Sequence, residues 1–412
     1  MPDGSRDSQG RDSQDSESHD REILGRDILA GLNGRVPAAL AEAVTSLPLV
    51  DHHVHGCFTT APTRSEFEQA INEGSPDPIP SFMTMFDSPL GFAIRRWGAP
   101  VLGLPAHASA EDYWAARSAL PVDELDRRFL SPAGVDRWII DTGFSTGAIS
   151  SPAVMTERSG APSSEILRLE QLAEQLIDRG ASASSFADDF RAALQAAAPG
   201  IVGFKTIAAY RTGFDIEWSQ PADAAVARAV AAWQAAATSG PARLTDPVII
   251  AFLIHAAAAL RLPIQFHVGF GDRDMDLHRS NPMLLLGLLR QSALAETPVM
   301  LLHCYPYHRE AGYLAQAFNN VYFDVGLSVN YVGAQSRQIV AESLELAPFA
   351  KQLYSSDAFG LPELHLLGSV LWRRSMAQVL GDWVTQGDWA EADAIRVVEM
   401  IGAGNARRIY GV

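Results

Sequence analysis

Short apolar runs alternate with longer stretches of helical spacing along most of this chain. Helical stretches such as Pro221–Ala237 and Pro247–Leu260 separate the runs. This rhythm is typical of βαβ units and a parallel sheet. The candidate strands are Leu47–Gly56, Val135–Asp141, Glu165–Glu170, Ile201–Thr206, Ile264–His267, Val299–His303, Val321–Val325 and Leu353–Asp357. About eight parallel strands close a barrel, so the pattern predicts an α/β protein of the (β/α)8 TIM-barrel class.

A long segment without a strong strand pattern follows the first candidate strand. Residues 59–130 contain amphipathic pieces, including Ser65–Asn72, Gly91–Trp97 and Ala110–Ala119. An insertion after a barrel strand sits over the carboxyl ends of the strands, where the active sites of such barrels are built. We therefore predict a helical insertion after strand 1 that forms a lid. Its apolar walls are expected from Phe82, Met83, Met85, Phe86, Phe92 and Trp97.

The beginning of the chain differs from the rest in composition. Residues 1–22 are rich in Asp, Ser, Arg and Gly and contain no apolar run, so they cannot bury enough surface to offset the entropy of ordering. We predict a disordered tail over 1–22, a helical lead-in over Ile23–Ser46, and one barrel over residues 23–412. The tail lacks the apolar part of a signal peptide and no later run is long enough to span a bilayer, which predicts a cytoplasmic protein.

Composition and charge restrict the partners. The chain has 412 residues, 47% of them hydrophobic, and a formal net charge of -16. Since no basic patch offsets this charge, nucleic acid and anionic membranes are not expected as partners. A small-molecule substrate is expected, and the sequence leaves open whether the chain forms a homo-oligomer. The two cysteines, Cys57 and Cys304, exclude a disulfide framework and are interpreted as small buried thiols.

Several candidate strands end in residues that bind metal ions. His53 and His55 are two positions apart in the first strand and therefore point to the same face. His267, His303 and Asp357 end the fifth, sixth and eighth strands. Because these strand ends meet at one mouth of a parallel barrel, the pattern predicts a divalent metal site there.

The residue types at this mouth indicate the chemistry. Imidazole and carboxylate ligands suit a borderline ion, Zn²⁺ first, with Mn²⁺ or Fe²⁺ as alternatives. One or two such ions would lower the pKa of bound water from about 15.7 to about 7 and provide a hydroxide nucleophile at neutral pH. Asp357 can both bind the ion and carry a proton from the attacking water to a leaving group.

Lys205 ends the fourth candidate strand and faces the same mouth. An ammonium group about 4 Å from a dication would experience on the order of 8 kcal/mol of repulsion at an effective dielectric constant of about 20. Lys205 therefore either lies away from the metal and binds a substrate carboxylate, or is carbamylated and bridges two metal ions. A third interpretation is that its side chain leaves the barrel and reaches solvent.

Five motifs relate the chain to a known group of proteins. They read D-H-H-V-H-G, G-F-K-T-I-A-A-Y-R-T-G, F-H-V-G-F-G-D, L-L-H-C-Y-P-Y-H-R-E and S-S-D-A-F-G-L-P-E. In combination they resemble the amidohydrolase superfamily. Within it, the chain is similar to the amidohydrolase-related domains that are fused ahead of glutamine-synthetase-like domains in fungal and plant proteins.

The resemblance covers about Leu47 to the C-terminus and implies roles for particular residues. The metal ligands that it implies are His53, His55, His267 and Asp357. It also implies that His303 either binds a second metal ion or polarises the scissile carbonyl as a catalytic residue. In binuclear members the lysine of the fourth strand is carbamylated, and Lys205 occupies that position in order.

Further residues beyond the strand ends are candidates for contacts with the substrate. Arg211, with its neighbour Tyr210, and Arg273 lie on loops where a guanidinium group can pair with a substrate carboxylate in bidentate fashion. Either arginine is also compatible with a salt bridge inside its loop. Asp324, on the seventh strand, is a candidate for orienting a ligand histidine through its second ring nitrogen.

Taken with the resemblance, these residues predict a metal-dependent hydrolase of the C–N bond in an amide. The expected substrate is small and carries a carboxylate, as a γ-glutamyl amide does; that detail rests on the family. Asp357 would carry the proton and His303 or the metal would stabilise the oxyanion. A metal-dependent decarboxylase of the same superfamily is the alternative, and a non-catalytic metal-dependent binding protein is a third hypothesis.

Overall fold

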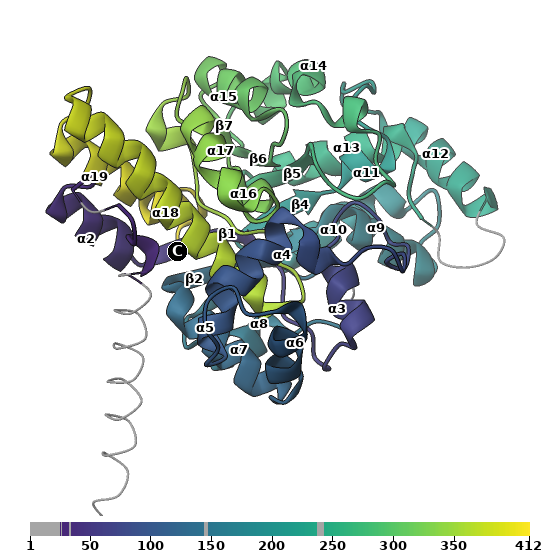
Figure 1. Ribbon diagram of the computed structural model, residues 1–412. Coiled ribbons are helices and arrows are strands. Elements are labelled where there is room, and N and C mark those ends of the chain that lie inside the picture. Colours follow the sequence, from purple (N-terminus) through teal and green to yellow (C-terminus); the bar gives the residue numbers. More distant parts are fainter. Residues whose placement is uncertain (1–24, 26, 33, 144–146, 237–242) are drawn as a thin grey trace, which may run out of the picture.

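Parallel strands form the centre of the computed structural model, which describes residues 25, 27–32, 34–143, 147–236 and 243–412. Among these residues, seven strands follow one another in the order β1 to β7, and each neighbouring pair is parallel, so the protein has an α/β fold with a curled parallel sheet (Figure 1). The strands are β1 Leu49–Val54, β2 Val135–Asp141, β3 Ser163–Arg168, β4 Gly203–Thr206, β5 Ile264–Val268, β6 Val299–His303 and β7 Val321–Phe323. Their common direction gathers their carboxyl ends at one edge.

The eighth predicted strand, Leu353–Asp357, is not a regular strand in the described chain. Its backbone nevertheless bonds to both ends of the sheet. Leu353 N donates to Phe323 O of β7 at 3.0 Å, and Asp357 N donates to His53 O of β1 at 3.1 Å. Asp357 has a φ of 49°, in the left-handed region, so the segment cannot continue as an extended ladder. It occupies the eighth position and brings Asp357 to the end of β1.

The third predicted strand is shifted in the structure. It was expected at Glu165–Glu170, but β3 begins at Ser163 and ends at Arg168. Helix α9 starts at Leu169, whose side chain is fully buried. The apolar residues that follow have helical spacing, and this packing determines the boundary. The shift leaves Arg168 at the carboxyl end of a strand.

Helices connect the strands and cover the sheet (Figure 1). Buried apolar residues form one large cluster around β1, β2 and α18, a second around β4, β5, β6 and α13, and a smaller one between strands. The helices after β2 are α8 Pro152–Ser159, α9 Leu169–Asp178, α10 Phe186–Ala197, α11 Ala208–Arg211, α12 Asp223–Ala236, α13 Pro247–Ala258, α14 Leu286–Leu289, α15 His308–Ala317, α16 Gly326–Tyr331, α17 Ser336–Ser343, α18 Pro362–Gln386, α19 Glu391–Glu399 and α20 Asn405–Tyr410.

The segment between β1 and β2 contains short helices, of which η2 and α7 pack against α18 (Figure 1). They are α3 Arg64–Ala70, α4 Pro89–Ala93, the π-helical turn η2 Ile94–Gly98, α5 Ala99–Val101, α6 Ala110–Ser118 and α7 Val122–Leu130. A buried ion pair joins this segment to α18, with Arg117 Nε 2.5 Å from Glu363 Oε1. Of the apolar residues predicted to wall a lid, Phe86 and Trp97 are buried, whereas Phe82, Met83 and Phe92 are exposed.

The predicted helical lead-in is interrupted before it reaches the sheet. Gly31 and Gly34 have φ values of 77° and 76°, a left-handed conformation that glycine adopts without a steric penalty. Helix α2, Ala38–Ser46, begins only after Pro37. The predicted tail over 1–22 lies outside the described residues.

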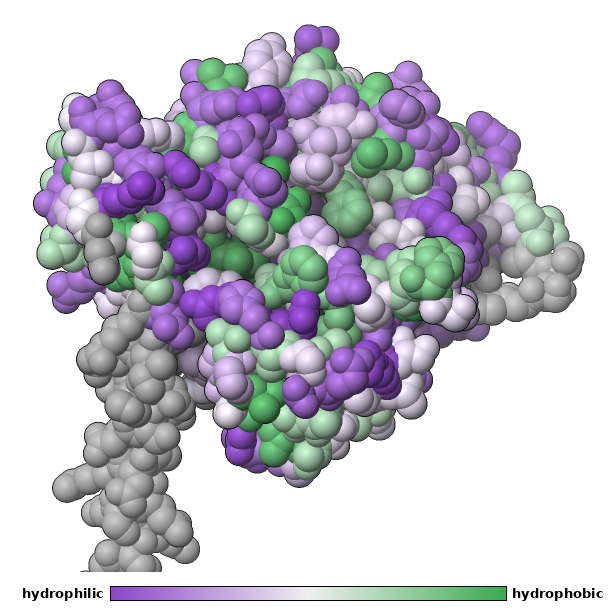
Figure 2. Space-filling model, viewed as in Figure 1, coloured by the Kyte–Doolittle hydropathy of each residue, from purple (hydrophilic) through white to green (hydrophobic). Residues whose placement is uncertain are grey.

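Polar residues cover most of the face shown in Figure 2, with apolar residues in smaller patches between them. Within the described parts of the chain, no helix combines the length and the apolar character needed to cross a bilayer.

Candidate active site

Three histidines and one aspartate meet where β1, β6 and the 353–357 segment end. Asp357 Oδ1 lies 3.0 Å from His53 Nε2 and 3.6 Å from His55 Nε2, and Asp357 Oδ2 lies 3.3 Å from His303 Nε2. All three histidines are buried. The structure therefore places these four residues, each predicted from a strand end, around one point.

Hydrogen bonds fix the rings of the two β1 histidines. His53 Nδ1 lies 2.8 Å from Gln265 Oε1, and His55 Nδ1 lies 2.9 Å from the backbone oxygen of Asp141. Because these oxygens only accept, each Nδ1 is the donor and each Nε2 is left with its lone pair toward Asp357. Gln265 is itself held, since its amide nitrogen donates to His52 O at 2.8 Å. This is the tautomer that a metal ion requires.

Asp324 supports the site differently from what the sequence predicted. It was expected to orient a ligand histidine through the ring, but its Oδ1 accepts from the backbone nitrogen of His303 at 3.0 Å and lies 4.0 Å from His303 Nδ1. The ring nitrogen that Asp324 contacts belongs to His52, at 3.0 Å. Asp324 therefore holds the backbone of His303 and the ring of His52, the residue that precedes His53.

Two of the candidate residues have a left-handed backbone. His303 has a φ of 67° and Asp357 a φ of 49°. Such conformations cost on the order of 1–3 kcal/mol each and persist only when surrounding interactions impose them. The hydrogen bonds to Asp324 and to the His53 carbonyl supply these interactions. The backbone is therefore held in the shape that points both side chains at the site.

A divalent metal ion fits these residues. Both ring nitrogens of His303 are buried, and neither has a hydrogen-bond partner among the described residues. Such a group is costly unless something binds it. The ligand atoms of His53, His303 and Asp357 lie within 4.8 Å of one another, as do those of His53, His55 and Asp141. Imidazole nitrogen with carboxylate oxygen is the donor set of Zn²⁺ and related ions.

Lys205 and His267 lie beside this cluster in different ways. Lys205 is buried, and its Nζ is 3.3 Å from His53 Nε2. The ring of His267 lies 4.8 Å from that of His303, but its Nε2 donates to the Phe270 backbone oxygen at 3.1 Å and is 3.1 Å from the hydroxyl of Tyr210. Lys205 therefore reaches a ligand atom, whereas Nε2 of His267 is engaged by other groups.

Burial determines the protonation behaviour of the cluster. It raises the pKa of Asp357 to about 7, although His55 and Lys205 oppose this effect. It lowers the pKa of Lys205 to about 8, against the attraction of Asp141 and Asp357. The pKa of His55 falls to about 4, and burial takes the pKa of His303 well below its usual value. Neutral imidazoles are the form that binds metal ions.

A cavity of about 590 Å³ opens onto these residues. Arg168 lies in its wall and donates to Asp141 Oδ2 at 2.5 Å. Glu73, from the segment between β1 and β2, also lines the cavity, and burial with repulsion from Asp357 raises its pKa to about 8. Among its walls are His53, His55, Phe58, Lys205, Tyr210, Arg211, Arg243, His267, Asp272, Asp357 and Phe359.

The three residues predicted to contact the substrate have different positions. Tyr210 and Arg211 both line the cavity, and Arg211 is paired with Glu174 at 2.9 Å. Arg273 is not among the residues that line it. Its guanidinium group is more than half exposed and pairs with Asp77. The loop after β5 turns this side chain outward, so the structure does not bring Arg273 to the site.

Sequence reasoning missed Asp141, Arg168, Gln265 and Glu73. Asp141 and Arg168 end β2 and β3, so the same strand-end argument that identified the histidines applies to them. Gln265 lies two positions before His267 on β5 and so shares its face, which is a detectable signal. Glu73 lies outside regular structure after α3, and no periodic signal marks it.

The α/β fold has parallel strands in sequence order, as TIM-barrel proteins do, and histidines and an aspartate at the strand ends that could hold a divalent metal ion. The chain belongs to the amidohydrolase family, whose sequence pattern matches residues 180–412. This confirms the resemblance seen in the motifs.

Individual relatives agree with this assignment. Protein fluG of Emericella nidulans is 27% identical over 414 residues, which cover 90% of this chain and 47% of fluG, so the chain spans about half the length of that relative. A protein of Lactobacillus casei ATCC 334, described as a metal-dependent hydrolase, has a similar structure with a TM-score of 0.79 and 28% identity, over 90% of this chain and 97% of that one. A uronate isomerase of Bacillus halodurans C-125 shares the fold, with a TM-score of 0.63 and 15% identity, over 95% and 97% of the two chains.

Proposed function

We propose that this chain is a metal-dependent hydrolase that cleaves the C–N bond of an amide in a small substrate carrying a carboxylate. The observation that carries the proposal is the Asp357 carboxylate between the Nε2 atoms of His53, His55 and His303, at the wall of a cavity. Membership of the amidohydrolase family supports the reaction class.

The residues that would hold one or two metal ions are His53, His55, His303 and Asp357, with His267 beside them. We propose Zn²⁺, with Mn²⁺ or Fe²⁺ as alternatives, because the donors are imidazoles and a carboxylate. When bound, such an ion supplies Lewis acidity and lowers the pKa of a water molecule to about 7.

The chain's own groups supply the remaining steps. Asp357 accepts the proton of the attacking water and gives it to the leaving nitrogen, so that an amine departs and a carboxylate remains. The hydroxyl of Tyr210 lies in the wall of the cavity and can donate to a substrate oxygen. Arg211 pairs with Glu174 in the wall of the cavity, and a guanidinium group has five N–H donors, so Arg211 can also bind the carboxylate of a substrate.

Lys205 takes part in the metal site as a carbamate in this proposal. Its Nζ is buried and 3.3 Å from a ligand atom, where an unmodified ammonium would be repelled by a dication. Addition of the amine to carbon dioxide forms an N–C bond, releases one proton and leaves an anionic ligand. Lys351 is the second of the two lysines in the chain, and its ammonium donates to backbone oxygens, including Phe318 O at 3.2 Å.

The first experiment measures metal content and lysine modification together. Protein purified with ¹³C-bicarbonate is expected to hold about two ions per chain by elemental analysis and to show a carbamate carbon in its NMR spectrum. Lys205→Ala should lose the carbamate signal and one ion, whereas Lys351→Ala should keep both. If the protein holds one ion per chain and Lys205→Ala does not change this number, the carbamate is refuted. Lys205 is then the residue that binds the substrate carboxylate.

The second experiment identifies the bond that is cleaved. A panel of amides of small dicarboxylates is incubated with metal-loaded protein, and the release of amine and of carbon dioxide is followed separately. Release of an amine supports the hydrolase. Release of carbon dioxide without amine would identify the decarboxylase alternative, and no turnover of amides or acids would favour a binding protein.

A further inference from the structure

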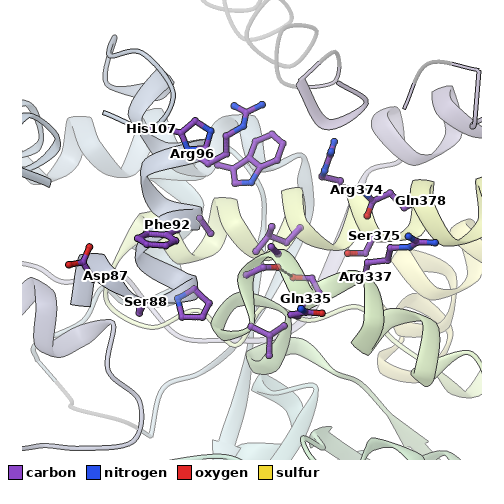
Figure 3. Close-up of a pocket in the computed structure, with 18 residues that line it drawn as sticks. Asp87, Ser88, Phe92, Arg96, His107, Gln335, Arg337, Arg374, Ser375 and Gln378 are labelled. Carbon is purple, nitrogen blue, oxygen red and sulfur yellow. Dashed lines mark hydrogen bonds between the residues drawn. The ribbon is translucent and has the colours of Figure 1, made fainter. Parts of the chain in front are cut away.

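A second cavity lies next to α18 and is separate from the active-site cavity. Its volume is about 680 Å³, and it shares no lining residue with the active-site cavity. Its walls come from α4 and η2 in the segment between β1 and β2, from the start of α17, and from α18 (Figure 3). Most of its lining is apolar and includes Phe92, Trp97 and Leu371.

Two guanidinium groups lie near the indole of Trp97 in this cavity. The Arg96 group lies 4.4 Å from the centre of the Trp97 ring, and the Arg374 group lies 6.0 Å from it. Neither arginine has a carboxylate oxygen within 4.0 Å among the described residues. Arg374 donates to backbone oxygens instead, including Ala30 O at 3.1 Å. The positive charge of both groups is therefore left without an anionic partner in the described chain.

The other charged residues that line the cavity do not neutralise Arg96 and Arg374. Arg337 is paired with Asp382 at 2.5 Å. Asp87 is also in the wall, but Figure 3 shows it at the left of the view beside Phe92, apart from Arg374. Burial and the charge of Arg96 lower the pKa of Arg374, as expected of two cations that share a site without an anion. In a chain with a net charge of -16, an uncompensated pair of arginines beside exposed apolar surface is a recognition feature.

We propose that this cavity binds a small organic anion, with its carboxylate or phosphate group between Arg96 and Arg374 and its apolar body against Phe92, Trp97 and Leu371. The volume lies in the range of small-molecule sites. Arginine forms paired hydrogen bonds with the planar edge of a carboxylate or with phosphate oxygens. An aromatic or alkyl body covers the half-exposed ring of Phe92, which is 53% exposed.

Calorimetric titration of the metal-loaded protein tests this site with three probes that share one ring system: 2-naphthoate, 1-naphthyl phosphate and neutral 2-naphthalenemethanol. Both anions are expected to bind at least about tenfold more tightly than the alcohol, because charge-assisted hydrogen bonds are lost with the neutral probe. The anion that binds more tightly identifies the head group, carboxylate or phosphate, that the site prefers. Equal binding of the alcohol would overturn the proposal.

Variants locate the binding. The double variant Arg96→Gln/Arg374→Gln should weaken anion binding about tenfold or more, and Arg96→Lys/Arg374→Lys should recover part of it. Arg337→Gln is the matched control, since this arginine lines the same cavity but already has Asp382 as its partner; its effect should stay within about twofold.

Two outcomes would overturn the proposal even if the probes bind. Loss of binding in Arg211→Gln, with no loss in the double variant, would place the probe in the active-site cavity. A dimer in sedimentation experiments that dissociates on the double substitution would show that a second copy of the chain covers these arginines. Thermal unfolding of each variant checks that a loss of binding is not a loss of folded protein.

Discussion

In the active-site cavity the Asp357 carboxylate faces three imidazole nitrogens, whereas in the cavity beside α18 neither Arg96 nor Arg374 has a carboxylate oxygen within 4.0 Å in the described chain. The active-site histidines are buried, and the hydrogen bonds that they donate to Gln265, Asp141 and Asp324 hold their rings and backbone. The arginines of the second cavity lie on helices, and their guanidinium groups lie 4.4 Å and 6.0 Å from the centre of one tryptophan ring. The comparison indicates that one cavity is organised for catalysis and the other for reversible binding of a small anion.

The largest effect is expected from the carboxylate at the centre of the active site. Asp357→Asn removes the proton acceptor but keeps the size of the side chain, so the rate of amide hydrolysis should fall by roughly 10²- to 10⁴-fold. Elemental analysis of the same preparation separates a loss of proton transfer from a loss of metal. Asp274→Asn, at the rim of the cavity and paired with Arg243, is the control and should change the rate little. Full hydrolysis by an Asp357→Asn variant that retains its metal would exclude the proton-carrying role.

Sequence reasoning reached the active site because the strand ends carry its chemistry. An apolar run that ends in histidine or aspartate marks both the strand and the direction of the side chain, so His53, His55, His303 and Asp357 were predicted from their positions. The same logic failed for Arg273, since a loop residue has no periodicity to fix its direction. Asp357 itself lies in a left-handed, irregular segment, and therefore the eighth strand was predicted but not formed as a ladder.

The second cavity could not be predicted for a different reason. Arg96 and Arg374 are far apart in the sequence, and only the packing of η2 against α18 brings them to one indole. Phe92 and Trp97 were noted as apolar walls of an insertion, but their partner surface was not visible in any local pattern. Contacts between helices that are distant in sequence depend on tertiary packing, which hydrophobic spacing does not encode.

The second prediction concerns the ion pair that fastens the segment between β1 and β2 to α18. Arg117 and Glu363 are 3% and 1% exposed, so removing one partner leaves a buried charge uncompensated. Arg117→Met should lower the free energy of unfolding by about 3–5 kcal/mol. Chemical denaturation measures this loss. The double variant Arg117→Met/Glu363→Leu should recover much of the stability, and a double variant as unstable as the single one would contradict this explanation.

A smaller effect should follow from loosening one ligand ring. Gln265→Leu removes the oxygen that accepts from His53 Nδ1, so the ring loses its orientation and its fixed tautomer. Metal affinity, measured by competition with a chelator, should fall by about 10- to 100-fold. Gln291→Leu provides a control, because within the described residues that side-chain amide bonds only to the Gly287 backbone oxygen on the surface. Unchanged affinity in Gln265→Leu would mean that the strand alone positions His53.

The smallest effect on the kinetics is expected for Arg273→Gln. Its kcat and KM compare directly with those of Arg211→Gln. Arg273 pairs with Asp77 on the surface, and exposed ion pairs contribute about 0–1 kcal/mol. Arg273→Gln should therefore leave kcat and KM within about twofold of the unmodified protein. Arg211→Gln should raise KM more than it lowers kcat, because its side chain lines the cavity where a substrate carboxylate would bind. If Arg273→Gln raised KM as much as Arg211→Gln, the loop after β5 would have to close over the cavity when substrate binds, and the outward position of Arg273 would describe only the open state.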